Sequence, residues 1–226
     1  MEEWTRQIDG YCERTDLTFW AEPVNAVTNL AFILAALWMW RRVRGQDLPV
    51  ADLLCALLFA IGVGSFLFHT FATIWAMLAD VIPIALFVLT YVYAANRHYW
   101  GMRRGLALLA TAGFVPYAAL TGPAFGALPF FQISAAYWPV ALLIALYALA
   151  LARRSPEVAR GLALGAGLLT LSLVLRSVDE TFCPTFPIGT HFFWHILNGI
   201  MLAWMIEVLR RHHASRSTES NGVGQA

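Results

Sequence analysis

Residues His191–Asn198, which read HFFWHILN, place two imidazoles four residues apart near the start of a long apolar run. Residues at this separation lie on one face of an α-helix. If the run is helical, His191 and His195 point in the same direction. The fold must then supply both side chains with polar partners inside an apolar environment.

A second apolar run contains SFLFH, in which a hydroxyl and an imidazole have the same four-residue spacing. These residues are Ser65 and His69, and Asp80 follows eleven residues after His69. A charged side chain at the centre of a membrane-length apolar segment costs about 3 kcal/mol or more, so such residues are rare there. We therefore treat Ser65, His69, Asp80, His191 and His195 as one candidate site.

The composition indicates a polytopic membrane protein. Of the 226 residues, 59% are hydrophobic and 13% are charged, which is too apolar for a soluble domain and too long for a single anchor. The net charge of +1, with arginines in short clusters and no lysine, argues against a nucleic-acid partner. The first 22 residues are polar and acidic, unlike a cleaved signal peptide, so we expect the N-terminal segment to remain part of the protein.

Seven apolar segments each approach the length of about 20 residues that a helix needs to cross a bilayer. They cover residues 24–40, 50–71, 72–96, 105–122, 131–152, 158–178 and 188–209. The predicted fold is therefore all-α, a bundle of seven transmembrane helices over residues 24–210. We expect an extracytoplasmic segment at residues 1–23 and a disordered cytoplasmic tail at residues 211–226.

The arginines predict the orientation, because twelve of the fifteen follow the first, third, fifth and seventh apolar segments. They are Arg41, Arg42, Arg44, Arg97, Arg103, Arg104, Arg153, Arg154, Arg160, Arg210, Arg211 and Arg216. By the positive-inside rule these loops are cytoplasmic, so the N-terminus lies outside and the C-terminus inside. At about 1.5 Å of rise per residue, all five candidate residues then lie in the outer half of the membrane, with Asp80 roughly 12 Å deep.

The cysteines are unevenly placed. Cys55 lies inside an apolar segment, whereas Cys12 and Cys183 lie in polar segments that this topology places outside. The residues alone allow either a disulfide between Cys12 and Cys183 or three free thiols. The topology favours the disulfide, because disulfides persist in oxidising compartments.

Three histidines near a carboxylate match the surroundings of a catalytic zinc, whose fourth position stays open for water. His69, His191 and His195 are the candidate zinc ligands. Asp80 is the candidate acid and base, which takes a proton from water and passes it to the leaving group. Ser65 is the candidate donor of a hydrogen bond to the oxyanion that forms on the attacked carbonyl.

Other interpretations of these residues stay open at this point. A single intramembrane histidine or serine commonly forms hydrogen bonds between helices, and Asp80 can pair with Arg176 instead. Haem fits poorly, because two imidazoles one turn apart on one helix cannot bind opposite faces of one macrocycle. A proton path lacks a second set of charges toward the inner leaflet.

The segment before the first helix is acidic and contains Asp9, Glu13, Asp16 and Glu22. Closely spaced carboxylates can bind Ca²⁺, but this spacing is not that of an EF-hand. The residues alone favour a solvated acidic segment with a helix start at Pro23.

With these motifs, the chain from about Tyr11 to Trp204 resembles the alkaline ceramidases and, more broadly, the superfamily of seven-helix membrane hydrolases that includes adiponectin-receptor-type proteins. The resemblance rests on SFLFH followed by Asp80, on HFFWH with its ILNG continuation, and on the N-terminal stretches YCE and AEPVNAVTN. The combination is specific, whereas each motif alone is not.

The resemblance implies a zinc-dependent amidase that hydrolyses the N-acyl bond of ceramide to a sphingoid base and a fatty acid. It also implies a disulfide from the N-terminal segment to the loop before the last helix, matched here by Cys12 and Cys183. The implied partners are the lipid bilayer and a lipid substrate.

A calcium ion in the N-terminal segment is implied as well. Glu13 and Glu22 match the family's ligands, and Tyr11 offers its carbonyl. Gly10 stands where the family has an aspartate, so Asp9 would serve from one residue earlier. A shortening of the segment leaves Thr15 or Asp16 as the remaining ligand.

We therefore expect a membrane enzyme with an acyl-chain cavity between its helices. The lysine-free composition and short loops predict a bacterial inner membrane, and in a eukaryotic cell the same topology places the site on the lumenal face of the ER or Golgi. The alternatives are a hydrolase of another lipid amide or ester and a non-catalytic receptor or scaffold with a structural zinc. Ser65 and Asp80 argue against a structural zinc, which needs no acid beside an open position.

Overall fold

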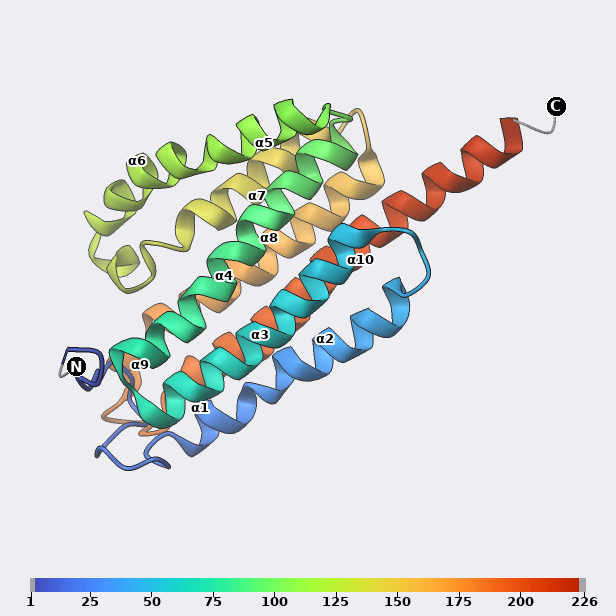
Figure 1. Cartoon of the computed structure of the whole chain (residues 1–226). Helices are drawn as coiled ribbons and strands as arrows, with labels where there is room; N and C mark the ends of the chain where they lie inside the picture. The colour runs from blue at the N-terminus through green and yellow to red at the C-terminus, as the bar shows by residue number, and fades with distance from the viewer. Residues whose placement is uncertain (1–2, 224–226) are drawn as a thin grey trace.

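The computed structural model describes residues 3–223 as an elongated bundle of helices (Figure 1). In chain order the elements are α1 (Pro23–Thr28), α2 (Leu30–Val43), α3 (Pro49–Phe71), α4 (Ile74–Ala94), the π-helical turn η1 (Ala95–Tyr99), α5 (Arg104–Ala112), α6 (Phe114–Gly126), the 3₁₀ turn η2 (Pro129–Ser134), α7 (Trp138–Leu151), α8 (Pro156–Ser177), α9 (Asp179–Phe182) and α10 (His191–Val223). Within these residues no strand forms, and one isolated bridge pairs Gln7 with Thr73.

The helices account for the predicted membrane crossings. Six helical stretches among the described residues are long and apolar enough to span a bilayer. They are Pro23–Val43, Pro49–Phe71, Ile74–Tyr99, Arg104–Gly126, Pro156–Ser177 and Phe192–Ser217. The seventh apolar helix, α7, has only 14 residues, because the start of the segment expected there forms η2 instead. The prediction of an all-α membrane bundle is confirmed.

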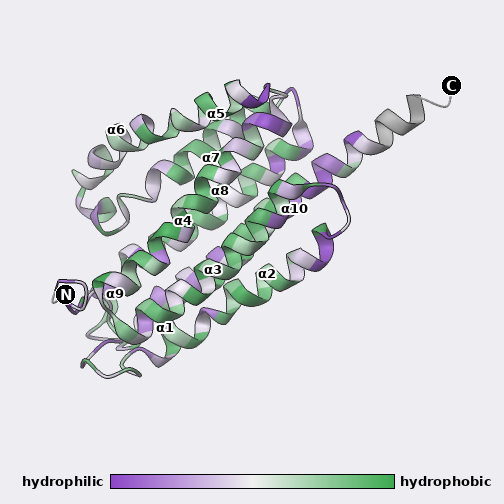
Figure 2. Cartoon of the chain, in the orientation of Figure 1, coloured by the Kyte–Doolittle hydropathy of each residue, from purple (hydrophilic) through white to green (hydrophobic). Residues whose placement is uncertain are grey.

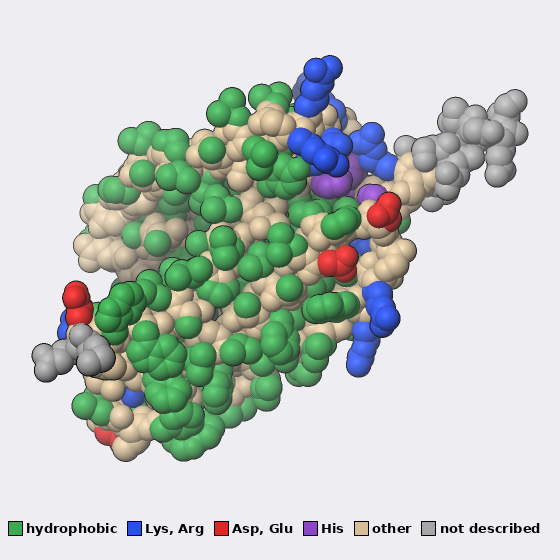
Figure 3. All heavy atoms as spheres, viewed as in Figure 1, with side chains coloured by type: hydrophobic (Ala, Val, Ile, Leu, Met, Phe, Trp, Pro, Cys, Tyr) green, Lys and Arg blue, Asp and Glu red, His purple; other side chains and the backbone are tan. Residues whose placement is uncertain are grey.

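Figure 1 shows α2, α3 and α10 on one side of the bundle and α5, α6 and α7 on the other, with α4 and α8 between them. Apolar side chains fill the interior. Hydrophobic residues predominate along the helices (Figure 2), and hydrophobic side chains cover much of the face seen in Figure 3. Helices that are apolar on all faces are typical of membrane spans. Proline in the first turn of α1, α3, α7 and α8 helps to set where these helices begin.

The bundle has two chemically different ends. The first, called here the histidine end, contains the N-terminal segment, the α3–α4 turn and the start of α10. The second, called the arginine end, contains the arginine-rich loops after α2, η1 and α7. Figure 3 shows most of the visible arginine side chains at the right-hand end of the view and smaller blue areas at the left-hand end. The length of the bundle therefore separates the arginine clusters from the candidate site.

A buried carboxylate joins two helices at the arginine end. Glu207 on α10 is 2% exposed and accepts hydrogen bonds from Arg42 on α2 and from Arg210 and Arg211 on its own helix. The bond from Arg42 joins the end of α2 to α10 and gives the buried carboxylate of Glu207 a cationic partner.

The sequence predicts a disordered tail from residue 211, whereas the structure describes α10 as helical through Val223. Extending a helix that already exists avoids the cost of nucleating a new one, so polar residues can continue it. Only residues 224–226 of the predicted tail lie outside the described residues.

Helices α3 and α4 approach each other closely near the candidate site. A Cβ atom at Gly64 would collide with the carbonyl oxygen of Ala79, so only glycine fits there without a shift of the backbone. The chain turns between the two helices through Ala72, which has a left-handed conformation with φ of 46°. The close approach brings the next residues, Ser65 and Asp80, to the same level of the bundle.

A disulfide and a buried carboxylate fix the start of α10. Cys12 and Cys183 are disulfide-bonded, with Cα atoms 5.2 Å apart, as predicted. The neighbouring Asp179 is 2% exposed, and its Oδ1 accepts hydrogen bonds from the backbone N–H groups of Thr190 and His191 at 2.5 and 2.9 Å. Its Oδ2 accepts a third from the Cys12 N–H at 3.1 Å. One side chain thus connects the N-terminal segment to the first turn of α10.

Replacing Asp179 with alanine should destabilise the histidine end, because three backbone donors lose their acceptor. A buried donor without a partner costs about 1–3 kcal/mol, so we expect the free energy of unfolding to fall by about 2 kcal/mol or more. Thermal unfolding of the detergent-solubilised protein measures this, with the exposed neighbour Glu180→Ala as the matched control. Equal unfolding temperatures for the two variants would contradict the role assigned to Asp179.

Candidate metal centre

Three histidines from two helices meet at the histidine end. His69 lies in the last turn of α3, and His191 and His195 occupy the first two turns of α10. All three are at most 2% exposed, and their potential ligand atoms lie within 4.8 Å of one another. Among the His, Cys, Asp and Glu side chains of the described residues, no other group of three has this geometry.

Two of these imidazoles have their Nδ1 atoms occupied by other protein groups. His69 Nδ1 lies 2.6 Å from a carboxylate oxygen of Glu22, which accepts hydrogen bonds, so we assign the proton to Nδ1. His195 Nδ1 lies 2.9 Å from the hydroxyl of Thr28. That hydroxyl donates its own proton to carbonyl oxygens one turn earlier in α1, so the proton of His195 is also assigned to Nδ1.

The other ring nitrogens of this pair then present lone pairs to each other. Nε2 of His69 and Nε2 of His195 are 3.1 Å apart. Two acceptor atoms at this distance repel each other unless a cation or a proton lies between them. Two nitrogen ligands of one tetrahedral zinc, each bound at about 2.0–2.1 Å, lie about 3.3 Å apart. The donor atoms and their spacing therefore fit zinc.

His191 brings the third imidazole to the centre. Its backbone N–H is held by Asp179, and its ring stacks on the ring of Tyr11 with centroids 3.7 Å apart. Its Nδ1 atom is buried and has no hydrogen-bond partner among the described residues. Leaving such an atom unsatisfied costs about 1–3 kcal/mol, and coordination to a metal ion would remove this cost.

The candidate acid and hydroxyl lie beside the histidines. Asp80 on α4 lies close enough to His69 and to Ser65, both on α3, to interact with them electrostatically. The Oδ1 atom of Asp80 is buried and lacks a hydrogen-bond partner within the described part of the chain. The two residues selected from the sequence thus lie close to His69, the histidine that α3 contributes.

Arg176, the alternative partner of Asp80, is bonded elsewhere. From α8 its guanidinium donates to two oxygens of η2 and to the hydroxyl of Tyr11. It also lies over two aromatic rings, at 5.4 and 5.6 Å from their centroids. The ion pairs found within residues 3–223 do not include one between Arg176 and Asp80. The carboxylate of Asp80 therefore does not form an ion pair with Arg176 in the described part of the chain.

The acidic residues expected to bind calcium are dispersed. Both carboxylate oxygens of Glu13 accept hydrogen bonds from the first N–H groups of α1, at 2.7 and 2.8 Å. Asp16 is exposed and accepts two hydrogen bonds from Thr18, which lower the pKa of its carboxyl. Asp9 is exposed as well. Burial raises the pKa of Glu13, against the effect of its N–H partners.

The other two expected calcium ligands belong to the histidine centre. Tyr11 stacks on His191, and Glu22 is bonded to His69 and to the guanidinium of Arg14. Burial alone would raise the pKa of Glu22, but His69 and Arg14 together lower it. The described residues therefore do not support the predicted calcium site, because protein donors already occupy the carboxylates of Glu13 and Glu22.

Three supporting residues are not identified from the sequence. They are Arg14, which pairs with Glu22, Thr28, which pairs with His195, and Asp179, which fixes the start of α10. The only available signal is the chemical requirement that a metal-binding histidine has a partner on its second nitrogen. That requirement points to acceptors near the site but does not say which ones fold onto it.

Comparison with known proteins gives the same assignment as the motifs. A model of the ceramidase family matches residues 5–223, nearly the whole chain and all of the histidine centre. None of the curated proteins compared matches the chain. On the extent of the family match, the chain belongs to the ceramidase family.

Proposed function

We propose that this protein is a zinc-dependent lipid amidase that hydrolyses the N-acyl bond of ceramide to a sphingoid base and a free fatty acid. Membership of the ceramidase family supports a hydrolase that acts on amides. The observation that carries the proposal is the buried histidine centre, in which two Nε2 lone pairs face each other beside an unpartnered carboxylate oxygen. A zinc held by three imidazoles keeps one position open for water.

His69, His191 and His195 would hold the zinc. When bound, the ion supplies a Lewis acid for the amide carbonyl and lowers the pKa of a water molecule at its open position. Asp80 takes a proton from the attacking water through its unpartnered Oδ1 atom. It delivers that proton to the amide nitrogen as the C–N bond breaks, which releases the sphingoid base as an amine and the acyl group as a fatty acid.

Ser65 would stabilise the negative charge that develops on the carbonyl oxygen during attack. Its hydroxyl lies one helical turn before His69 and next to the Asp80 carboxylate. The close approach of Gly64 to α4 holds it there. Donors aligned in advance with a developing oxyanion are worth several kcal/mol in enclosed sites, typically about 2.7–4 kcal/mol each.

An apolar cavity of about 80 Å³ lies inside the bundle along α10. Its lining includes Trp194 and Asn198 beside His195, and Met201 and Met205 deeper in the bundle. From residue 194 to residue 205 a helix rises about 16 Å. The cavity begins at neighbours of His195 on α10, and we propose that it takes the acyl chain of a substrate whose carbonyl lies at the histidines.

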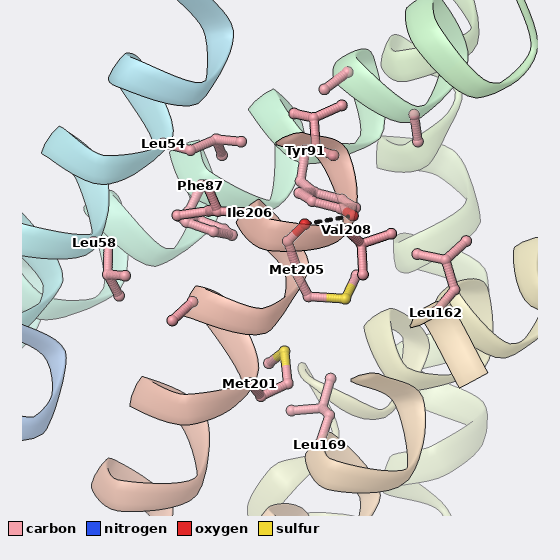
Figure 4. Close-up of a cluster of buried hydrophobic side chains, with 14 of the residues drawn as sticks. Leu54, Leu58, Phe87, Tyr91, Leu162, Leu169, Met201, Met205, Ile206 and Val208 are labelled. Atoms are coloured by element: carbon pink, nitrogen blue, oxygen red, sulfur yellow. Dashed lines mark hydrogen bonds between the residues drawn. The ribbon is translucent and has the colours of Figure 1, made fainter. Parts of the chain in front are cut away.

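The cavity must widen to admit a long acyl chain, because pockets for lipid-sized ligands measure roughly 300–1,000 Å³. Figure 4 shows the side chains of Met201 and Met205 near Leu162 and Leu169, and the Tyr91 hydroxyl bonded to the Met205 carbonyl oxygen at 3.0 Å. Methionine side chains are unbranched and adapt readily. We propose that rotation of these two methionines makes room for the chain.

We further propose that the histidine end faces the extracytoplasmic side and that the C-terminus is cytoplasmic. The arginine-rich loops lie together at the opposite end, as the positive-inside rule requires. A bacterial inner membrane is the proposed location, with an ER or Golgi membrane as the eukaryotic equivalent. An amphiphile such as ceramide can then enter laterally from the bilayer.

Ceramide hydrolysis by the purified, detergent-solubilised protein tests the proposed function, with zinc content measured in the same sample. We expect release of the sphingoid base and about one zinc per chain, consistent with a single three-histidine centre. Zinc without ceramide hydrolysis would redirect the search to another lipid amide or ester. Zinc without hydrolysis of any such lipid would favour the receptor or scaffold.

Substitution of His191 or His195 by alanine should remove both zinc and activity, because two remaining imidazoles do not complete the ligand set. Metal analysis and the ceramide assay measure the two effects. His98→Ala at the arginine end is the matched control and should retain both. Full activity in both His191→Ala and His195→Ala would rule out this centre as the zinc site.

Asp80→Asn should retain zinc but lose turnover by about 10²–10⁴-fold, the range typical of a removed general acid or base. The amide keeps the shape of the carboxyl group but cannot accept the proton from water. The exposed Asp52→Asn on α3 is the control. Turnover at the wild-type rate would show that Asp80 has a structural role only.

A further inference from the structure

The side chain of Arg14 is buried at the histidine end, although arginine is usually exposed. The side chain is 1% exposed, and each of its three nitrogen atoms has an acceptor. Nε donates to Glu22 Oε1 at 2.5 Å, one terminal nitrogen donates to the carbonyl oxygen of Asp16 at 3.2 Å, and the other donates to the carbonyl oxygen of His69 at 3.1 Å. Arg14 therefore contacts both the backbone of a candidate zinc ligand and the carboxylate that faces its ring.

Glu22 connects the guanidinium to the imidazole. Its Oε1 binds Arg14, and its Oε2 accepts hydrogen bonds from His69 Nδ1 at 2.6 Å and from the Asn25 side chain at 3.1 Å. Glu22 itself is 3% exposed. A buried carboxylate without a nearby cation is strongly destabilised, so the position of Glu22 depends on the charge of Arg14.

This arrangement leaves little opportunity for a calcium ion. Both oxygens of Glu22 are used by Arg14, His69 and Asn25, and both oxygens of Glu13 are used by the N-terminus of α1. A divalent cation bound at Glu22 would also be repelled by the adjacent guanidinium. The positive charge next to this carboxylate is instead part of the polypeptide.

We propose that Arg14 is a positioning residue whose guanidinium serves as a built-in cation, holding Glu22 against His69 and so orienting that imidazole for zinc without calcium. The inference rests on the proposed zinc centre. Carboxylates that accept from the second nitrogen of a metal-binding histidine fix its tautomer and orientation. Arginine suits the task because it stays charged when buried and its planar fork reaches several acceptors at once.

The test is the zinc affinity of the full-length protein, measured by competition with a chromophoric chelator. Arg14→Gln should bind zinc about 10–100-fold more weakly than the wild type, the usual effect of losing such an outer partner. The control is Arg6→Gln, which removes an exposed arginine from the same segment and should leave the affinity unchanged. Equal affinities for the two variants would overturn the proposal.

Two further measurements separate positioning from a general loss of folding. Arg14→Ala is purified with added guanidinium or with urea, a neutral molecule of similar shape, and only guanidinium should restore zinc affinity. Arg14→Gln combined with Glu22→Gln should be no weaker than the weaker single variant, since the two residues act through one contact. Rescue by urea, or additive losses in the double variant, would contradict the inference.

A measurement with added calcium tests whether Arg14 alone supplies the positive charge beside Glu22. Added Ca²⁺ should not change the zinc affinity of the wild type, and an increase would show that an external cation is needed after all. Because zinc affinity is measured without substrate, failure of ceramide hydrolysis would remove the proposed substrate and leave the role of Arg14 standing. A wild-type protein that binds no zinc would remove both.

Discussion

The facing Nε2 atoms of His69 and His195, 3.1 Å apart in an apolar bundle, are the interaction on which the rest of the histidine end depends. Their lone pairs point at each other only because Glu22 and Thr28 occupy the opposite nitrogen of each ring. The surrounding protein holds both rings in place, and the proposed zinc ion would offset the repulsion between them.

Several separate contacts hold the histidine rings in place, and each acts on a different segment of the chain. The missing Cβ of Gly64 lets α3 approach α4, which sets Ser65 and Asp80 at one level. Asp179 and the Cys12–Cys183 disulfide fix the first turn of α10, where the other two histidines lie. The centre is therefore assembled from both ends of the chain, and the match to the ceramidase family includes both ends.

The fold and the clustering of the three histidines are predictable from the sequence for simple physical reasons. Hydropathy identifies the membrane helices, and polar residues inside them are costly enough to stand out. The calcium ligands are a different case, because the family resemblance that implies them does not show which donors occupy each carboxylate in this chain. Arg14 lies two residues after Cys12 in an irregular segment, and its contact with Glu22 exists only once that segment folds onto α3. Hydropathy and spacing carry no information about such contacts.

The guanidinium of Arg14 differs from a bound calcium ion because it cannot dissociate from the protein. The guanidinium of Arg14 is present as soon as the N-terminal segment folds, and its charge does not depend on the concentration of a divalent metal outside the cell. The disulfide at Cys12 keeps that segment beside α9, so Arg14 cannot easily leave Glu22. Orientation of His69 then becomes a property of the folded chain, and zinc is the only ion that the proposed chemistry requires. In a membrane that faces a variable exterior, such a centre would stay assembled when external calcium falls.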